Sequence, residues 1–181
     1  MKNMMISLLS IVIVYIAYKS VPILIYKYKR YTAHTKAINT IAPDANASTL
    51  EGKVWHMKEQ QGKNIIVVFW GSYCHPCLAE IPHIQELYQK YKDNDNLEII
   101  TYSFDLSQNS EALKKFIDDK NITYPVLLEK YPQDSEKNFA KKFEVIGVPS
   151  IWFIDKNGIV LASNRRSIEE IMPFIKKYLH Q

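Results

Sequence analysis

Apolar residues recur along this chain with two different periods, and each period predicts one kind of element. Continuous or alternating apolar runs are typical of strands, and they predict strands within 50–57, 62–70, 97–105, 124–129, 150–155 and 159–163. Apolar residues spaced three and four apart are typical of helices, and they predict helices over 75–91, 110–120, 134–143 and 167–180. The alternation of strands and helices predicts an α/β fold with a mixed central sheet and helices on both faces.

Local signals refine two of these elements. The turn "KNG" at 156–158 joins two apolar runs and therefore predicts a β-hairpin. The helix over 134–143 is expected to begin at Asp134 or Ser135, because both side chains can accept a hydrogen bond from the first turn.

The longest apolar segment lies at the amino terminus. Met4–Tyr26 contains one charge, Lys19, and at about 1.5 Å per residue a helix of this length would cross a bilayer. No suitable small-residue cleavage site follows its uninterrupted part. We therefore expect a transmembrane anchor (or uncleaved signal) over 1–30, a linker over 31–41 and a folded domain over 42–181. The alternative is a cleaved signal peptide with an unusual site.

The net charge of +4 is concentrated beside this apolar segment. Residues 1–30 contain five of the 23 Lys and Arg residues and no acidic residue, so the rest of the chain contains 18 basic and 19 acidic residues. A nearly neutral domain gives no support for a phosphate-binding surface. We expect no nucleic-acid partner.

The chain contains two cysteines, Cys74 and Cys77, in the stretch "WGSYCHPCLAE". A disulfide across so short a loop restricts the unfolded chain very little, so a structural bridge has a weak rationale. A C-x-x-C pair after a strand and at the start of a helix predicts redox chemistry. The N–H groups and dipole of the first turn stabilise a thiolate. Cys74 is therefore the predicted attacking thiol, and Cys77, one turn further, the predicted resolving thiol.

Two neighbours extend this predicted catalytic site. His75 lies between the cysteines and is expected to favour the Cys74 thiolate, as a cation or through an N–H hydrogen bond. Glu80 lies on or beside the apolar stripe of the helix, where its carboxyl group is expected to exchange a proton with Cys77. The plainer interpretations are a solvated His75 and a Glu80 side chain that reaches water.

A metal site is the main competing interpretation of the cysteine pair. Structural zinc needs four ligands, whereas only His75 and His83 lie near the cysteines and a second C-x-x-C is absent. Copper(I) suits two thiolates, so a non-enzymatic copper-binding module stays an alternative. The leading prediction includes no metal and no cofactor.

The stretch "FWGSYCHPCLAEIP" (69–82), with "APD" (42–44) upstream and "GVPSIWFIDKNG" (147–158) downstream, resembles the thioredoxin superfamily. It is most similar to the membrane-anchored TlpA-like and ResA-like thiol–disulfide oxidoreductases of bacteria. The resemblance implies a thioredoxin fold over about 41–180, with 108–129 as a helix-plus-strand insertion.

The resemblance also implies roles for single residues. Pro149 would be a cis-proline packed against Cys74, and the Val148 backbone would pair with a bound substrate segment. Glu80 falls on the family's acidic position, and Val68 replaces the buried aspartate of plain thioredoxins. The predicted substrate-binding residues are Val148, Pro149, Pro76, Tyr73 and Trp70.

The resemblance implies a reductant of extracytoplasmic proteins, including apocytochromes c, that is itself reduced by a membrane electron donor of the thiol-reducing type. The same chemistry run as a disulfide donor stays an alternative, because a histidine between the cysteines stabilises the reduced thiolate and makes the pair more oxidising.

Two arguments conflict about the side of the membrane. The basic residues that follow the apolar segment, Lys27, Lys29, Arg30 and Lys36, favour a cytoplasmic domain by the positive-inside rule. The resemblance implies an extracytoplasmic domain, and an anchored dithiol is more useful where disulfides persist. We therefore expect a single-pass protein of the bacterial cytoplasmic membrane with a periplasmic domain.

Overall fold

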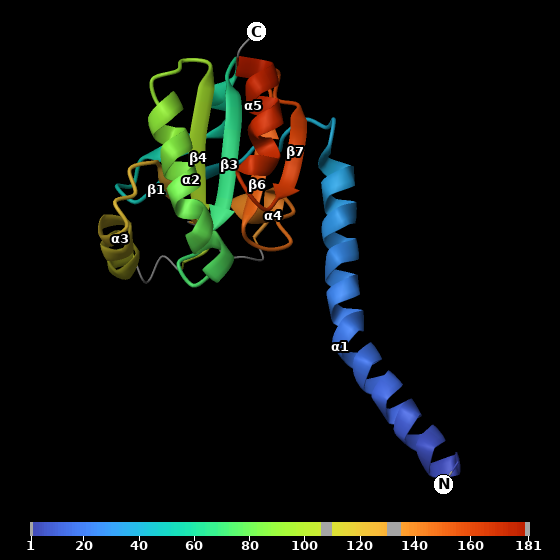
Figure 1. Cartoon of the computed structure of the whole chain (residues 1–181). Coiled ribbons are helices and arrows are strands. Elements are labelled where there is room, and N and C mark those ends of the chain that lie inside the picture. Colours follow the sequence, from blue (N-terminus) through green and yellow to red (C-terminus); the bar gives the residue numbers. More distant parts are fainter. Residues whose placement is uncertain (1, 106–109, 130–134, 180–181) are drawn as a thin grey trace.

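The protein is represented by a computed structural model, which describes residues 2–105, 110–129 and 135–179 (Figure 1). Its helices are α1 (Lys2–Ala37), α2 (His75–Tyr91), α3 (Ser110–Asp119), α4 (Phe139–Lys142) and α5 (Met172–Leu179), with short 3-10 helices at Met57–Gln60 and Glu169–Ile171. Its strands are β1 (Asn46–Thr49), β2 (Val54–His56), β3 (Asn64–Trp70), β4 (Leu97–Ser103), β5 (Val126–Leu128), β6 (Ser150–Ile154) and β7 (Val160–Arg165).

The strands form one mixed sheet in the order β2-β1-β5-β4-β3-β6-β7. The central strand β3 pairs in parallel with β4 and antiparallel with β6, and all seven of its residues are buried. Trp70 lies opposite Ser103, and Phe69 lies opposite Ser150. The carboxyl ends of β3 and β4 and the start of β6 therefore meet at one end of the sheet, from which α2 begins.

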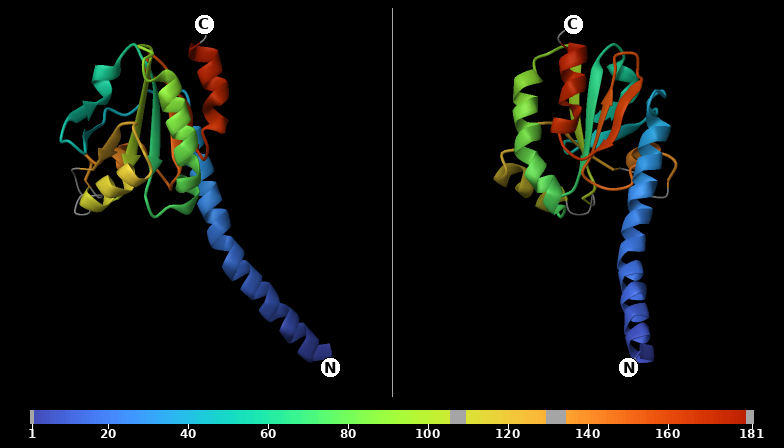
Figure 2. Two further views of the ribbon diagram at one scale, coloured as in Figure 1. Left: turned by 60° about the vertical axis from the view of Figure 1, so that its left-hand side comes forward. Right: turned by 45° about the vertical axis from the view of Figure 1, so that its right-hand side comes forward.

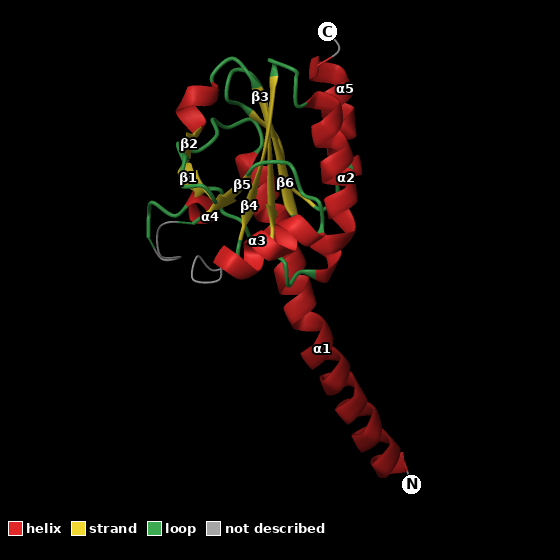
Figure 3. Cartoon of the chain, turned by 90° about the vertical axis from the view of Figure 1, so that its left-hand side faces the viewer, coloured by secondary structure: helices red, strands yellow, loops and turns green. Residues whose placement is uncertain are grey.

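Alternate side chains of β3 enter two different cores, because successive residues of a strand point to opposite faces of the sheet. Ile66 and Val68 face the core formed with α2 and α5. Ile65, Val67 and Phe69 face the core that contains Phe139 and Phe143 from the α4 region. Figure 3 shows α2 and α5 together on one side of the sheet. The predicted α/β fold with helices on both faces is confirmed.

The structure differs from the prediction at β1 and at the helix around α4. The strand β1 was not predicted, because "NAST" carries no strong apolar pattern; it is held by pairing with β2 and β5. The helix expected over 134–143 is the single turn α4, whose N-cap is Asn138 and not Ser135; Asp134 lies outside the described residues. The Asn138 side chain accepts a hydrogen bond from the Lys141 amide, whereas the Ser135 hydroxyl accepts one from the Lys137 amide in a preceding turn.

The amino-terminal helix α1 is longer than the predicted anchor. It continues to Ala37 and therefore includes most of the segment expected to be a linker. Its part from Ser10 to Ala37 is long and apolar enough to cross a membrane, as an anchor or a signal sequence would be. Figures 1 and 2 show its later turns beside β7 and its earlier turns extending away from the domain.

Candidate active site

The two cysteines lie at the start of α2 and form a disulfide with an S–S distance of 2.07 Å. Cys74 is the N-cap of the helix, and its sulfur accepts a hydrogen bond of 3.3 Å from the Cys77 amide. Its carbonyl accepts bonds from the Cys77 and Leu78 amides. The first-turn N–H group of Cys77 is thus directed at the Cys74 sulfur, where it would stabilise a thiolate, and Cys74 lies at the helix start that the sequence predicted.

The two cysteines differ in exposure. Cys74 is 8% exposed, whereas Cys77 is 1% exposed. A partner's sulfur therefore reaches Cys74 more readily than Cys77, which is the asymmetry that separates an attacking thiol from a resolving thiol.

The residues around Cys74 form an exposed rim. His75 and Pro76 are exposed at the first turn of α2, and Tyr73 is 69% exposed. The Tyr73 ring lies over Gly71: a methyl group at Gly71 would come within 2.8 Å of it. Partial burial and the nearby Asp105 carboxylate raise the pKa of the Tyr73 phenol, so it stays a neutral hydrogen-bond donor.

Trp70 was expected to contact substrate, and the structure corrects this expectation. Its side chain is 1% exposed, and its ring lies 5.8 Å from the ring of Phe116 on α3. Trp70 is the last residue of β3, whose alternation turns its side chain into the α2-side core. It belongs to the same buried core cluster as Cys74 and packs under the loop that leads to that residue.

Asp105 is a site residue that the sequence analysis missed. Its carboxylate accepts hydrogen bonds from the Ser72 amide (2.9 Å), the Ser72 hydroxyl (2.6 Å) and the Ser103 hydroxyl (2.6 Å). It therefore fixes the loop between β3 and Cys74 to the end of β4. The available signal was an aspartate just beyond a buried strand, at the end of the sheet where the cysteines lie.

The loop before β6 completes this end of the sheet. The Val148–Pro149 peptide bond is cis, which confirms the conformation predicted for Pro149. Pro149 is buried, while Val148 is half-buried and packs against the core cluster that contains both cysteines. Ser150, the next residue, pairs with Phe69 of β3, so the loop lies beside the strand that leads to Cys74.

Glu80 lies one turn beyond Cys77 on α2, a spacing that puts the two side chains on the same face of the helix. It is half-buried, and its carboxylate accepts a hydrogen bond of 2.9 Å from the Ile168 amide. It also lines a groove of about 380 Å³ between α2 and the segment before α5. Glu80 is thus held at the edge of the buried stripe, with access to solvent through the groove.

The described residues contain no group of three or more His, Cys, Asp or Glu side chains arranged to hold a metal ion. His83, the second histidine considered as a ligand, lines the same groove as Glu80. It lies on α2 six residues beyond Cys77, nearly two helical turns away.

Residues 38–163 match the AhpC/TSA family. The chain belongs to this family. It is 33% identical over 138 residues to the thiol-disulfide oxidoreductase ResA of Bacillus thuringiensis subsp. konkukian (strain 97-27), with 75% of each chain covered. It is 28% identical over 120 residues to the thioredoxin-like protein YneN of Bacillus subtilis (strain 168), with 66% of each chain covered. With its C-x-x-C pair, the chain is a ResA-like thiol–disulfide oxidoreductase.

Solved structures support the fold. The thioredoxin domain of a thiol-disulfide oxidoreductase from Bacteroides vulgatus superposes with a TM-score of 0.65 at 24% identity, covering 78% of this chain and 97% of that one. A thiol-disulfide oxidoreductase from Bacteroides fragilis NCTC 9343 also gives 0.65, at 21% identity, covering 76% and 98%. The thioredoxin-like fold predicted from the sequence is confirmed.

Proposed function

We propose that this protein reduces disulfides of extracytoplasmic proteins, with Cys74 as the attacking thiol and Cys77 as the resolving thiol. The observation that carries the roles of the two cysteines is the position of Cys74, which is the N-cap of α2 and the more exposed cysteine; the reductive direction is proposed through the resemblance of the sequence to its family. The similarity to ResA supports the reaction class. Apocytochromes c are the proposed substrate class, through the resemblance of the sequence to its family.

The reaction proceeds in two exchanges. The Cys74 thiolate attacks a substrate disulfide, which forms a mixed disulfide and releases one substrate thiolate that takes up a proton. Cys77 then attacks the Cys74 sulfur, which releases the second substrate thiol and leaves the Cys74–Cys77 disulfide. The substrate gains two electrons and two protons, and a membrane dithiol donor restores the reduced pair.

The rim residues bind the substrate segment in this proposal. The half-buried Val148 backbone would pair with the segment beside Pro149. The exposed Tyr73 and Pro76 would contact it on the other side of Cys74. His75, exposed beside Cys74, would stabilise the thiolate.

A redox titration against glutathione tests the direction. We expect a reduction potential near that of thioredoxin, about −270 mV, together with reduction of a protein disulfide such as that of insulin. A potential above about −150 mV would overturn the reductant proposal in favour of the disulfide-donor alternative. Stoichiometric copper retention without exchange activity would overturn both in favour of a metal-binding module.

Glu80 is proposed to take the proton of Cys77 when that thiol becomes a nucleophile. Glu80→Gln keeps the side-chain shape but removes this acceptor, so we expect the resolving step to slow roughly tenfold or more and its pH–rate profile to change shape. Stopped-flow measurement of mixed-disulfide decay reads this step directly. The nearby Glu86→Gln is the control, because Glu86 lines the same groove further from the cysteines. An unchanged profile in Glu80→Gln would contradict the proton role.

We propose a single-pass anchor in the bacterial cytoplasmic membrane, with residues 42–181 as an extracytoplasmic domain. Two of the basic residues that argued for a cytoplasmic domain have partners in the domain: Lys36 pairs with Glu144, and Arg30 donates to backbone carbonyls. These two basic residues therefore have a role in contacting the domain, independent of the side of the membrane on which they lie. An alkaline phosphatase fusion at the carboxyl terminus should be active; an inactive fusion with a fluorescent cytosolic reporter would reverse this assignment.

A further inference from the structure

The last turns of α1, residues 26–37, form what we call the juxtamembrane arm, and this arm packs on the domain. His34 Nδ1 lies 2.9 Å from the Ser163 hydroxyl on β7, and Ala33 is buried. Beyond the helix, the Asn39 amide donates to the Val160 carbonyl and the Val160 amide donates to the Thr40 carbonyl. The arm is therefore attached along the exposed edge of β7.

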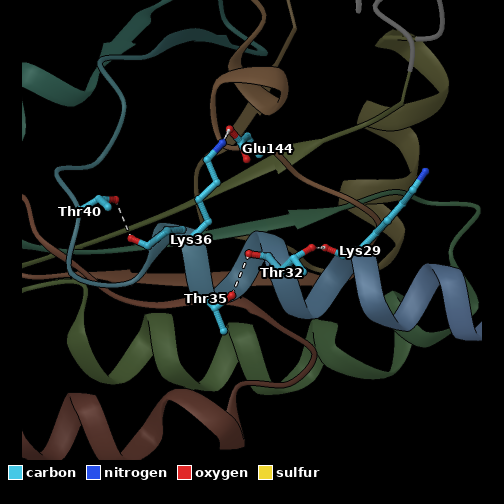
Figure 4. A network of polar contacts seen from close by, with 7 residues as sticks. Lys29, Thr32, Thr35, Lys36, Thr40 and Glu144 are labelled. Carbon is cyan, nitrogen blue, oxygen red and sulfur yellow. Dashed lines mark hydrogen bonds and ion pairs between the residues drawn. The ribbon is translucent and has the colours of Figure 1, made fainter.

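An exposed ion pair joins the arm to the domain on a second side, and exposed pairs contribute little free energy. Lys36 forms an ion pair of 2.6 Å with Glu144, shown in Figure 4. The Thr32 and Thr35 hydroxyls donate to the carbonyls of Lys29 and Thr32 one turn earlier (Figure 4), so the arm satisfies these polar groups within its own helix. The contacts with Glu144, Ser163 and Val160 join this region to the domain, which a freely rotating linker would not do.

The other end of the arm contacts the cis-proline loop. The Arg30 guanidinium donates to the Pro149 carbonyl at 3.2 Å and also to the Asn164 carbonyl. The Tyr26 hydroxyl accepts bonds from Arg30 and Arg166. It also lies against Gly147, where a methyl group would come within 2.6 Å of it. The apolar segment of α1 therefore ends at the level of the loop beside the active site.

The helix continues from Tyr26 toward its amino terminus as one element that contains Pro22. In Figures 1, 2 and 3 it leaves the domain at the end where β3 finishes and α2 begins. The helix has 36 residues, and about 20 cross a bilayer, so the arm is the part left outside the lipid. Tyr26, Tyr28 and Tyr31 are exposed there by 37%, 69% and 66%, and tyrosine is enriched at membrane interfaces.

We propose that the juxtamembrane arm holds the Cys74 face of the domain against the membrane surface. The partner that this face fits is a membrane protein whose reactive cysteine pair lies at the level of the lipid headgroups. Exposed apolar side chains lie on the same face: Tyr73 beside Cys74, and Ile146, 37% exposed, before the cis-proline loop. The exchange itself rests on the function proposed above, whereas the orientation rests on the contacts of Tyr26 and Arg30.

The orientation can be measured without redox activity. The full chain with Cys74→Ser and Cys77→Ser would carry one nitroxide label, at Tyr73→Cys or at Asn157→Cys in the exposed β6–β7 turn at the far end of the domain. In vesicles of phosphatidylcholine and phosphatidylglycerol with a nickel-chelating lipid, we expect relaxation of the label at 73 to be enhanced at least fivefold more than at 157. Equal or reversed enhancement would overturn the proposal.

Variants of the arm test whether its contact with the cis-proline loop sets the orientation of the domain. Arg30→Ala should reduce the difference between the two labels by half or more. Arg30→Lys should restore part of it, because lysine keeps one donor for the carbonyls that Nη2 reaches but lacks the second nitrogen, Nη1, which donates to the Tyr26 hydroxyl. Lys36→Ala is the matched control, because Lys36 lies on the same helix but pairs with Glu144, which is also exposed. Equal effects of Arg30→Ala and Lys36→Ala would show that the contact with the cis-proline loop does not set the orientation.

The partner is tested with a disulfide peptide joined to a lipid by a short or a long spacer, in the same vesicles. We expect the reduced full chain to react with both peptides at rates within about threefold. Reaction with the long spacer alone would mean that the active site faces away from the membrane and serves water-soluble partners. Failure with both, while the labels still report a membrane-facing site, would contradict the proposed function and leave the orientation standing.

Discussion

Cys77→Ser is expected to accumulate mixed disulfides on Cys74, whereas Cys74→Ser is expected to reduce exchange to the uncatalysed rate. The reason is the asymmetry of the pair. Cys74 is the N-cap, and its sulfur accepts a hydrogen bond from the Cys77 amide. It is also the more exposed of the two, because Cys77 is only 1% exposed. Without Cys77, the attack step still occurs but the second exchange cannot, so the substrate stays covalently bound.

Trapping by mass spectrometry after alkylation measures this effect and names the substrates. A double variant, Cys74→Ser with Cys77→Ser, is the control for adducts that do not involve the pair. Equal trapping by the two single variants would mean that the roles of Cys74 and Cys77 are reversed or shared.

Asp105→Ala is expected to lower both stability and exchange rate. It leaves the Ser72 amide and the Ser72 and Ser103 hydroxyls without their acceptor, and a hydrogen bond to a charged group contributes about 1.5–3 kcal/mol. Because Asp105 is half-buried, we expect a loss of about 2 kcal/mol in the free energy of unfolding. Cys74 follows Ser72 by two residues, and misplacing a reacting group by about 1 Å can cost a hundredfold in rate.

Asp155→Ala is the matched control. Asp155 accepts hydrogen bonds from the Asn157 and Ile159 amides, at 2.9 and 2.8 Å, in the turn at the opposite end of β6. We expect chemical denaturation to give a similar loss of stability for Asp155→Ala but an unchanged exchange rate at a temperature where both variants are folded. Equal exchange rates in the two variants would show that Asp105 supports the fold without positioning Cys74.

Most secondary structure followed from local patterns. The helix α2 was predicted over the residues that it occupies, because its buried residues Ile81, Ile84 and Leu87 recur at helical spacing. The short strand β1 was missed, because its conformation depends on partners in β2 and β5. The helix around α4 was predicted to begin too early. It begins after the N-cap Asn138, which is buried, and burial is set by the tertiary structure and not by the local sequence pattern.

The site residues likewise divide into those predicted from the sequence and those placed only by the tertiary structure. The sequence by itself determined the redox pair and the position of Glu80 one turn from Cys77, because each depends on a local motif, whereas the cis conformation of Pro149 was predicted through the family resemblance. Only the tertiary structure buried Trp70 against Phe116 and joined Asp105 to Ser72, 33 residues away. It also joined Arg30 to Pro149, 119 residues away. Local periodicity specifies contacts within a turn or a strand pair, whereas contacts over such separations depend on how the strands are ordered in the sheet.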